Sequence, residues 1–499
     1  MCNVQARTVL WHLVFIGFAV NYMICINLNI TIVEMVVPIK IETLSYADLP
    51  EASEMSATGL RNNSVNITPD APIRFNWNEY QQALVLGSFF WAHWLTQIPG
   101  GIMAKKYGTK LVFGLANVLG CWLCFLIPAT ARWDFRALIV LRVLQGLIMG
   151  FTWPAMHVMT GKWIPPNERS KFVTAYLGSS VGIAFFYPLF GYIMHWSSWV
   201  WVYHFCGIFG TVWWLGWLYF VYDSPAQHPR ISDSELRYIE KSLGSAVQNA
   251  SAVGTPWKEI FLSRPVWMNV IAQFGVIWGL FTLMTQAPTY FRVIHQWDIR
   301  ATGILSGLPH LMRMIFAYGF SIFADYLLKR EKMSRTNVRK LATTICCILM
   351  GMVVLVLAYF GNKSTTAIVL LSLAIMFHGT VSTGALASMV DIAPNFAGIV
   401  MGISSTIGVL PGFISPYIVG VLTLGNQTFE AWKWVFQICG AILIGCGVLY
   451  VLFADSTLQK WNEYNSRAKD RELVQLNEDD SHGAKIDEDP SYLKPKGGG

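Results

Sequence analysis

Apolar residues gather in long runs along most of the chain, and short polar stretches separate these runs. Many runs reach 20 residues, which lets a helix cross a hydrocarbon core of about 30 Å. The pattern therefore predicts twelve membrane-spanning helices. We place these spans at 9–37, 79–104, 111–131, 137–160, 171–195, 199–222, 266–291, 302–325, 341–360, 366–390, 396–424 and 432–454.

Composition favours the same class of protein. Of the 499 residues, 54% are hydrophobic and only 13% are charged, whereas soluble domains carry about 25% charged residues. The first span is too long for a removable signal peptide and lacks a small-residue cleavage site. We therefore expect an all-α, multi-pass membrane protein that keeps its first span.

Basic residues predict the orientation of the spans. With the N-terminus inside, 25 of the 36 lysines and arginines fall in cytoplasmic segments and nine in outer loops. This is the positive-inside distribution, and it places both termini in the cytoplasm. Four N-x-S/T sequons then lie in outer loops, two of them in the first loop, 38–78. The predicted glycosylation sites are Asn62, Asn66, Asn362 and Asn426.

A polar segment, 223–265, divides the spans into an N-terminal half, 1–222, and a C-terminal half, 266–454. The acidic tail, 455–499, has a composition typical of disorder. Within the polar segment, ISDSELRYIEKSLG predicts an amphipathic helix on the cytoplasmic surface. We expect its capping box to run from Ser232 to Glu235 and its apolar face to hold three residues. These are Leu236, Ile239 and Leu243.

Three pairs of short motifs relate the two halves at a nearly constant offset. GGIMAKKYG after span 2 corresponds to FSIFADYLLKR after span 8, IPPN to IAPN, and YPLFGYI to SPYIVGV. Such internal repetition indicates duplication. Two parallel halves of six helices describe the major facilitator fold, which holds substrate near the membrane midplane between the halves.

Arg142 is the first candidate binding residue, in the stretch LRVLQGLIMGFTWPAMH of span 4. A helical projection places it on one side with Gly146, Trp153 and His157, and small residues on that side indicate contact with other helices. Arg142 lies about 8 Å from the outer end of the span. A snorkelling arginine at the membrane interface is therefore the alternative.

Arg313 lies deeper, about 17 Å from either end of span 8, with His310 on the same side of the helix. Two intramembrane cations without a carboxylate at mid-span indicate that an anionic substrate supplies the counter-charge. The alternative is a structural arginine paired with backbone carbonyls or with a carboxylate at the edge of the span.

Several stretches resemble solute carrier family 17, the anion–cation symporters that include sodium-phosphate cotransporters, sialin and the vesicular glutamate transporters. The resemblance covers residues 10–455 and is strong toward insect members described as inorganic phosphate cotransporters. The stretches are GSFFWAHWLTQIPGG, RVLQGLIMGFTWPAMH, PPNERSK, VYDSPAQHP, LPHLMR and DIAPNFAGIVMGISSTIG.

The resemblance also implies site residues. Arg142 and His157 match the family pattern, and substrate-lining positions of the glutamate transporters fall on His93, Trp153 and Phe281. For the two aromatic residues, helix packing is the alternative, and for His93 the alternatives are ligand contact, proton relay and packing.

This chain also departs from the family pattern. Arginines that organic-acid members carry in spans 1 and 7 correspond to Cys25 and Val276, and glutamates of proton-coupled relatives correspond to Gln145 and Met149. Arg313 does not match the glutamate transporters, and we expect it to replace the missing cations. Four further residues are candidates for coupling or gating. They are His157, His310, Glu34 and Asp391.

These observations predict a secondary active transporter of small anions that works by alternating access, through sodium-coupled symport of inorganic phosphate or an organic anion. Sodium is favoured because span 4 lacks acids, while Ser88, Thr96 and Asn27 offer oxygen ligands. Proton-coupled or voltage-driven transport of an acidic sugar, an amino acid or urate is the alternative. A non-transporting receptor or scaffold on the same fold is the alternative from another class.

The sequence contains no motif that indicates an enzyme or a metal site. The sequence has no Walker motif and no HExxH, and GSSVG lies inside a span rather than at a strand–helix turn, so we expect no enzyme, no bound metal and no cofactor. Basic patches are topology determinants rather than nucleic-acid sites. We expect a monomer. We expect it in the plasma membrane, because the tail lacks a complete endosomal signal. A lysosomal or vesicle membrane is the alternative.

Overall fold

The computed structural model describes residues 5–37, 74–165, 168, 172, 174–243 and 256–463, and the regular structure of this part is helical. The N-terminal half contains long apolar helices that are interrupted in several spans. Its elements are α1 (Ala6–Met35), α2 (Glu79–Trp91), η2 (His93–Thr96), α3 (Gln97–Tyr107), α4 (Thr109–Cys124), α5 (Ile127–Trp133), α6 (Phe135–Met149), α7 (Thr152–Trp163), η3 (Thr174–Leu177), α9 (Gly178–Trp196) and α10 (Trp199–Phe220).

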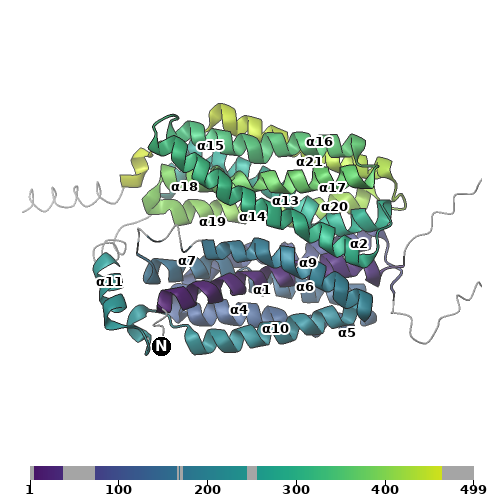
Figure 1. The fold of residues 1–499 in the computed structure, drawn as a ribbon, viewed down its shortest axis with the longest axis horizontal. Coiled ribbons are helices and arrows are strands. Elements are labelled where there is room, and N and C mark those ends of the chain that lie inside the picture. Colours follow the sequence, from purple (N-terminus) through teal and green to yellow (C-terminus); the bar gives the residue numbers. More distant parts are fainter. Residues whose placement is uncertain are drawn as a thin grey trace, which may run out of the picture.

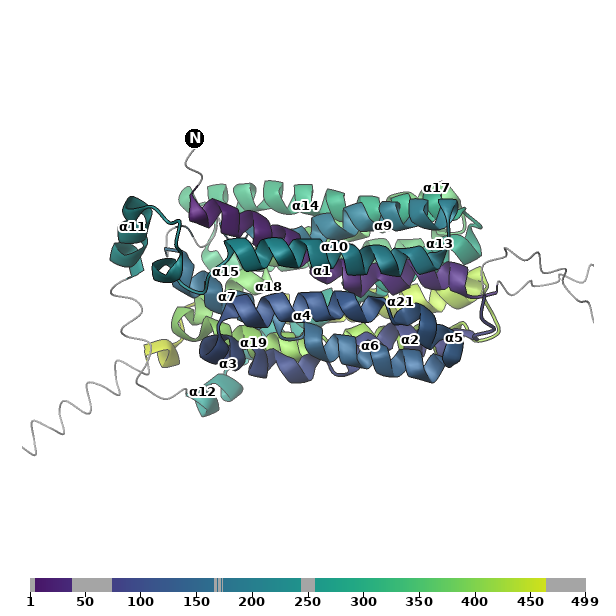
Figure 2. The same ribbon diagram turned by 90° about the horizontal axis from the view of Figure 1, so that it is seen from below.

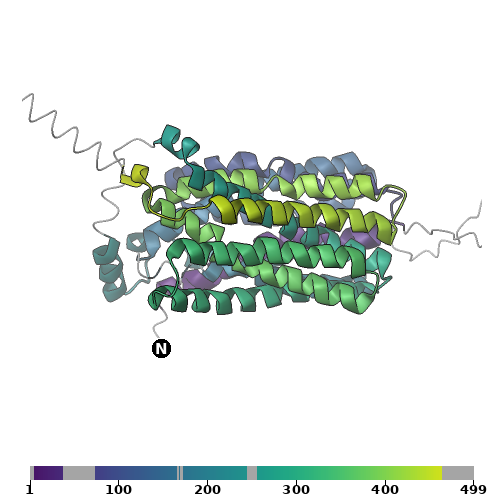
Figure 3. The ribbon, with the colours of Figure 1, turned by 90° about the horizontal axis from the view of Figure 1, so that it is seen from above.

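The C-terminal half repeats this arrangement, and Figure 1 shows its helices as a layer above α1, α4 and α10. Here η6 is a turn of π-helix and the other η elements are 3-10 turns. The elements are α13 (Arg264–Ile294), α14 (Ile299–Lys329), α15 (Arg335–Thr343), η6 (Thr344–Leu349), α16 (Met350–Phe360), α17 (Ser364–His378), η7 (Gly379–Ser382), α18 (Ala385–Ile392), η8 (Pro394–Phe396), α19 (Ala397–Gly408), α20 (Pro411–Leu422) and α21 (Phe429–Phe453). Figure 3 views the molecule from above relative to Figure 1, so that this half lies in front, with the yellow-green α21 beside the green helices.

In order along the chain, each predicted span corresponds to a helical segment. Nine segments of the described part are long and apolar enough to cross a membrane, and α4 with α5, bent by 46°, forms a tenth. The other two predicted spans correspond to α2–η2–α3, which is broken at His93, and to α10, which is rich in tryptophan. Spans 4 and 10, which correspond in the two halves, are both interrupted, the first after Met149 and the second after His378.

The ends of the bundle agree with the predicted orientation. The first residues of α1 and the turn η9 (Lys460–Glu463) lie at one end, together with α11 (Asp233–Leu243) (Figure 1). Figure 2 shows α11 beyond this same end and α12 (Trp257–Leu262) beside the bundle near it, and this is the cytoplasmic end on the charge distribution.

The halves meet closely where α9 packs against α14. A Cβ added at Gly303 would lie 2.6 Å from the carbonyl oxygen of Tyr187, so only glycine allows this approach of the two backbones. The hydroxyl of Tyr187 donates a hydrogen bond to the carbonyl of Met284 on α13, at 2.7 Å. Tyr187 therefore joins the N-terminal half to two helices of the C-terminal half, α13 and α14.

Polar contacts between the halves also lie at the outer end. Arg292 of α13 donates to Glu34 of α1 at 3.1 Å, and Arg74 donates to the other oxygen of Glu34 at 3.0 Å. The backbone N–H of Gly425 donates to the carboxylate of Glu79 at 3.1 Å. At the cytoplasmic end, by contrast, the ion pairs found among the described residues stay within one half.

Candidate functional site

Arg142 lies on α6 with its side chain inside the N-terminal half, and the residue is 1% exposed. Its Nη1 donates to the carbonyl of Ile24 at 3.2 Å, to Oδ1 of Asn27 at 3.4 Å and to Oε1 of Gln145 at 3.0 Å. Its guanidinium carbon lies 4.8 Å from the centre of the Phe89 ring, which is cation–π distance. The alternative of a snorkelling interfacial arginine is therefore wrong.

Gln145 orients this arginine. Its amide nitrogen donates to the carbonyl of Gly120 at 2.9 Å, which turns its amide oxygen toward Arg142. Because glutamine is neutral, the pair leaves the positive charge uncompensated. Within the described segments no carboxylate forms an ion pair with Arg142, and its Nε has no hydrogen-bond partner.

Gly146 explains how the aromatic ring of α2 reaches Arg142. A Cβ on Gly146 would lie 1.7 Å from the carbonyl oxygen of Phe89, so α6 and α2 touch backbone to backbone. The carbonyl of Gly146 accepts a hydrogen bond from Nδ1 of His93, at 3.1 Å. The small-residue stripe predicted from the sequence thus positions two of the predicted site residues, Arg142 and His93.

The predicted residues on the helices around this point form two groups. In the first, Phe281 of α13 lies 4.6 Å from the ring of Phe90, which lies 6.2 Å from the ring of His93. This group crosses from one half to the other. It places His93 and Phe281 near one aromatic ring, and their contact with substrate remains a prediction.

The second group lies further along span 4, on α7. The ring of Trp153 packs at 4.6 Å from Phe18 and at 5.7 Å from Tyr176. His157 is exposed, and its ring meets the face of Tyr176 at 5.3 Å. Trp153 therefore has the packing contacts that the alternative interpretation required, while His157 is accessible from water.

Arg313 lies on α14 and is 9% exposed. Its Nη2 donates to the hydroxyl of Ser180 on α9, across the boundary between the halves. As for Arg142, the described residues provide no carboxylate in an ion pair with it. In the described structure the two arginines share no hydrogen-bond partner, because Arg142 donates to residues of α1 and of its own helix and Arg313 donates to α9.

His310 and His378 are buried on α14 and at the end of α17. In the described part of the chain, neither ring nitrogen of either histidine has a hydrogen-bond partner. Most buried polar groups in proteins are hydrogen-bonded, so these imidazoles are exceptional.

The predicted acids serve as ion-pair partners at opposite ends of the bundle. Glu34 joins the halves at the outer end through Arg292. Asp391 of α18 accepts from Arg339 at 2.7 Å, and Arg339 also donates to the carbonyl of Thr383. Asp391 therefore fastens the cytoplasmic end of the C-terminal half, and it contacts neither arginine of the spans.

The oxygen ligands suggested for sodium each have a hydrogen-bond partner within the protein. Ser88 donates to Val85 within its own helix, and Thr96 donates to the carbonyl of Leu147. Oδ1 of Asn27 accepts from the Arg142 guanidinium, a contact that disfavours a second cation. Sodium binding by these side chains remains a prediction.

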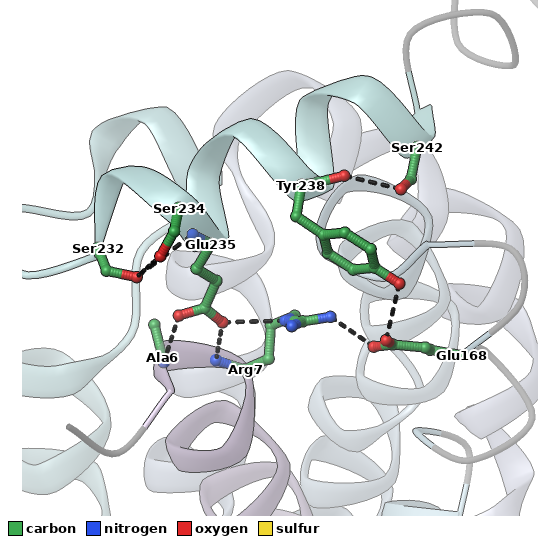
Figure 4. Close-up of polar contacts among 8 residues, drawn as sticks. All are labelled: Ala6, Arg7, Glu168, Ser232, Ser234, Glu235, Tyr238 and Ser242. Atoms are coloured by element: carbon green, nitrogen blue, oxygen red, sulfur yellow. Dashed lines mark hydrogen bonds and ion pairs between the residues drawn. The ribbon is translucent and has the colours of Figure 1, made fainter. Parts of the chain in front are cut away.

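Glu235 makes contacts that the sequence did not predict. The backbone N–H of Glu235 does lie 3.3 Å from the hydroxyl of Ser232, so one part of the capping box forms. The carboxylate, however, accepts from the backbone N–H groups of Ala6 and Arg7 at 3.0 and 3.2 Å and from Nε of Arg7 at 2.9 Å (Figure 4). The other interaction of the predicted capping box, in which the Glu235 side chain would accept from the backbone N–H of Ser232, is therefore wrong. The first N–H groups of α1 need an acceptor, and they bind this carboxylate instead.

Arg7 extends this contact to the loop between spans 4 and 5. Its Nη1 binds the carboxylate of Glu168, which also accepts from the hydroxyl of Tyr238 at 3.0 Å (Figure 4). Ile239 is buried beside Glu235, as predicted for the apolar face of α11. We call Arg7, Glu168, Glu235 and Tyr238 the cytoplasmic latch, because it joins α1, α11 and the span 4–5 loop.

Two of the predicted glycosylation sites can be located. Asn362 and Asn426 are exposed in turns at the outer end of the C-terminal half. Asn62 and Asn66 lie outside the described residues, as does most of the tail. Glycosylation of all four remains a prediction.

Comparison with known proteins gives the class first. The family model described as Major Facilitator Superfamily matches residues 14–416 and, in a second match, 333–479. A D-xylose–proton symporter has a similar fold, with a TM-score of 0.59 and 13% identity over 90% of this chain and 98% of that one. A bacterial homologue of the human lysosomal transporter Spinster, in an inward-facing and occupied conformation, has a TM-score of 0.62 and 12% identity over 90% and 97%. The chain is a multi-pass membrane transporter of this superfamily, not an enzyme.

Sequence relatives define the family within that class. Vesicular glutamate transporter 1 of Bos taurus is 36% identical over 460 residues, which cover 91% of this chain and 78% of that protein. Vesicular glutamate transporter 2 of Homo sapiens is 36% identical over 462 residues, covering 91% and 75%. The chain therefore belongs to solute carrier family 17, as its sequence motifs predicted.

Proposed function

We propose that this chain is a secondary active transporter of small anions that works by alternating access. The observation that carries the proposal is the pair of buried guanidiniums, on α6 and α14, that have no carboxylate partner in the described segments. A charge inside the membrane is costly unless something compensates it, and a transported anion would do so. The similarity to vesicular glutamate transporters, which are named for an anionic amino acid, supports this class of substrate.

The contacts between the halves are consistent with one state of such a cycle. Glu34 and Arg292, Glu79 and Gly425, and the close packing of α9 on α14 hold the halves together at and below the outer end. In the part of the chain that is described, none of the ion pairs at the cytoplasmic end joins the two halves. We infer a conformation that is closed on the outer side, in which substrate leaves toward the cytoplasm.

Arg142 gives the direct test. In liposomes that contain the purified chain, Arg142→Gln should abolish saturable uptake of phosphate, while Arg136→Gln should leave it unchanged. Arg136 is the matched control because it is an exposed arginine on the same helix. Normal uptake by a monodisperse Arg142→Gln variant would contradict the proposal. A wild-type protein that accumulates no anion under any gradient would favour the scaffold alternative.

Sodium-coupled phosphate symport is our proposal for the cargo and the driving ion, with organic anions as the alternative cargo. Its support is the departure of the chain from its relatives, since Gln145 and Met149 provide no acid on span 4. Uptake should fall when choline replaces sodium at fixed pH and voltage. Comparison of phosphate, glutamate, urate and sialic acid as cargo, each at the same gradients, identifies the substrate.

Proton coupling is the second candidate, and the histidines favour it. His157 is exposed beside Tyr176, and His310 and His378 have imidazoles without hydrogen-bond partners in the described structure. A histidine changes charge near neutral pH. Uptake that persists in choline and follows an imposed pH gradient would establish this candidate and reject sodium.

For the cellular location we propose the plasma membrane. The vesicular relatives favour the alternative of a vesicle membrane. Localisation of the untagged protein decides between them, because exclusive vesicle staining would reject the plasma membrane.

A further inference from the structure

A row of polar side chains follows one face of α14. Ser306, His310 and Arg313 are spaced by four and three residues, which places them above one another on a helix. All three are buried, with at most 9% of each residue exposed. The row faces the interior of the bundle although it lies deep within a membrane-spanning helix.

A fourth polar side chain, His378 of α17, belongs to the same cluster. A Cβ on Gly379, the next residue, would lie 2.5 Å from the carbonyl oxygen of Arg313, so the end of α17 packs directly on α14. His378 itself is buried, with 4% of the residue exposed. We call Ser306, His310, Arg313 and His378 the α14 cluster.

The α14 cluster is rich in unused hydrogen-bonding groups. In the described structure, the hydroxyl of Ser306 and both ring nitrogens of His310 and of His378 have no partner. The guanidinium of Arg313, which carries five N–H donors, has the hydroxyl of Ser180 as its hydrogen-bond acceptor. Leaving a buried polar group unpaired is costly, so these three side chains together need a ligand or water.

The charge of the surroundings indicates which ligand fits. The neighbouring helices α9, α13 and α17 contain no Asp or Glu, and the first acid of α14 after Arg313 is Asp325, twelve residues on. On α1 the acid is Glu34, which pairs at the outer end. The cluster therefore presents a fixed positive charge and several N–H and O–H donors without an internal counter-charge.

We propose that the α14 cluster is an anion-binding site on the C-terminal half, where α14 borders α9, that is separate from Arg142 and takes a small inorganic anion. Arg313 supplies the charge, the two imidazoles each supply an N–H donor, and Ser306 supplies a hydroxyl donor. The proposal rests on the proposed anion transport for the identity of the physiological ligand. Binding itself is independent of transport and is measured separately.

The experiment measures the melting temperature of the purified full chain in detergent against phosphate and against chloride, at fixed pH and with gluconate holding the ionic strength. A ligand that binds the folded state raises this temperature in a saturable way. We expect saturation for the wild type and an apparent Kd at least about tenfold higher for Arg313→Gln, because charge-assisted hydrogen bonds are lost. Phosphate and chloride curves identify which of the two anions the site prefers.

Control variants separate the two arginines. Arg300→Gln, at an exposed residue near the start of α14, should keep the wild-type curve. Arg142→Gln should keep a saturable response to anion even when its transport is lost, because the α14 cluster is intact in this variant. A response that disappears in Arg142→Gln but persists in Arg313→Gln would overturn the proposal. Absence of any saturable response in the wild type would show that water fills the cluster.

Ser306→Asp tests the cluster without removing the arginine. A carboxylate at this position, one turn from His310, would act as an internal anion. We expect a higher melting temperature without added anion and no further rise when anion is added. A lower melting temperature with the anion response intact would overturn the proposal, whatever the outcome for transport in liposomes.

Discussion

Replacing Glu235 with alanine should detach α11 from the N-terminus of α1. The carboxylate accepts two backbone N–H groups and the Nε of Arg7, and the Glu235 side chain is 5% exposed. Losing the cap on the first turn of α1 costs about 1 kcal/mol. The charged contact adds about 1 to 2 kcal/mol rather than the full cost of an unpaired buried charge, since Arg7 keeps Glu168. The local loss is thus about 2 to 3 kcal/mol.

A loss of this size multiplies the population of the detached state by about 30 to 150, because 1.4 kcal/mol is a factor of ten. Hydrogen exchange of peptides from α11 and from the start of α1 measures that population when reclosing is fast. Exchange in Glu235→Ala should accelerate by this factor in both peptides. Glu240→Gln, at an exposed acid on the same helix, should leave both unchanged.

Two results would contradict this reasoning. Exchange that changes less than threefold in Glu235→Ala would mean that Ile239 and the remaining contacts of α11 hold the helix without the carboxylate. Acceleration in α11 alone would mean that the first N–H groups of α1 find another acceptor.

Three further predictions concern packing, gating and pH. Gly146→Ala should prevent folding or reduce expression severely, because its Cβ would overlap the backbone of α2, whereas Gly161→Ala, with open space around it, should be tolerated; fluorescence size-exclusion chromatography measures both. Glu34→Gln should weaken the outer contact with Arg292 and increase labelling of single cysteines placed below it; unchanged labelling would contradict a gate. Asp298 caps α14, and the hydrogen bond that its carboxylate accepts from the backbone N–H of Ala301 lowers the pKa of this carboxyl below the ordinary 3.8. Its contribution to the stability of the folded state is therefore present above about pH 4 and is lost as the pH falls. Asp298→Asn should remove that part of the pH dependence of the melting temperature.

Much of the fold could be predicted because hydrocarbon imposes one simple rule. A span needs about 20 apolar residues, and this rule locates even α10, whose tryptophans lower its mean hydropathy. The rule does not show where a span breaks. The interruption at His93 depends on its contact with the carbonyl of Gly146, 53 residues away, and no local pattern contains that information.

The sequence could predict which residues form the candidate site but not which groups they contact. Buried charge in an apolar run draws attention to Arg142 and Arg313, and a glycine four residues after Arg142 indicates a helix contact. What each guanidinium binds depends on tertiary structure. Glu235 shows the limit most clearly, since a local capping rule and a contact across 229 residues compete for one carboxylate, and the distant contact prevails.

The shared carboxylate at the outer end has a consequence for the energetics of opening. Glu34 holds one arginine from its own half, Arg74, and one from the opposite half, Arg292. When the halves part, Glu34 keeps Arg74, and only Arg292, already 30% exposed, moves into water. No charge is left buried and alone, so the barrier from this contact is about that of a surface ion pair, 0 to 1 kcal/mol. The ion pair between Glu34 and Arg292 can therefore break and re-form at little cost in free energy.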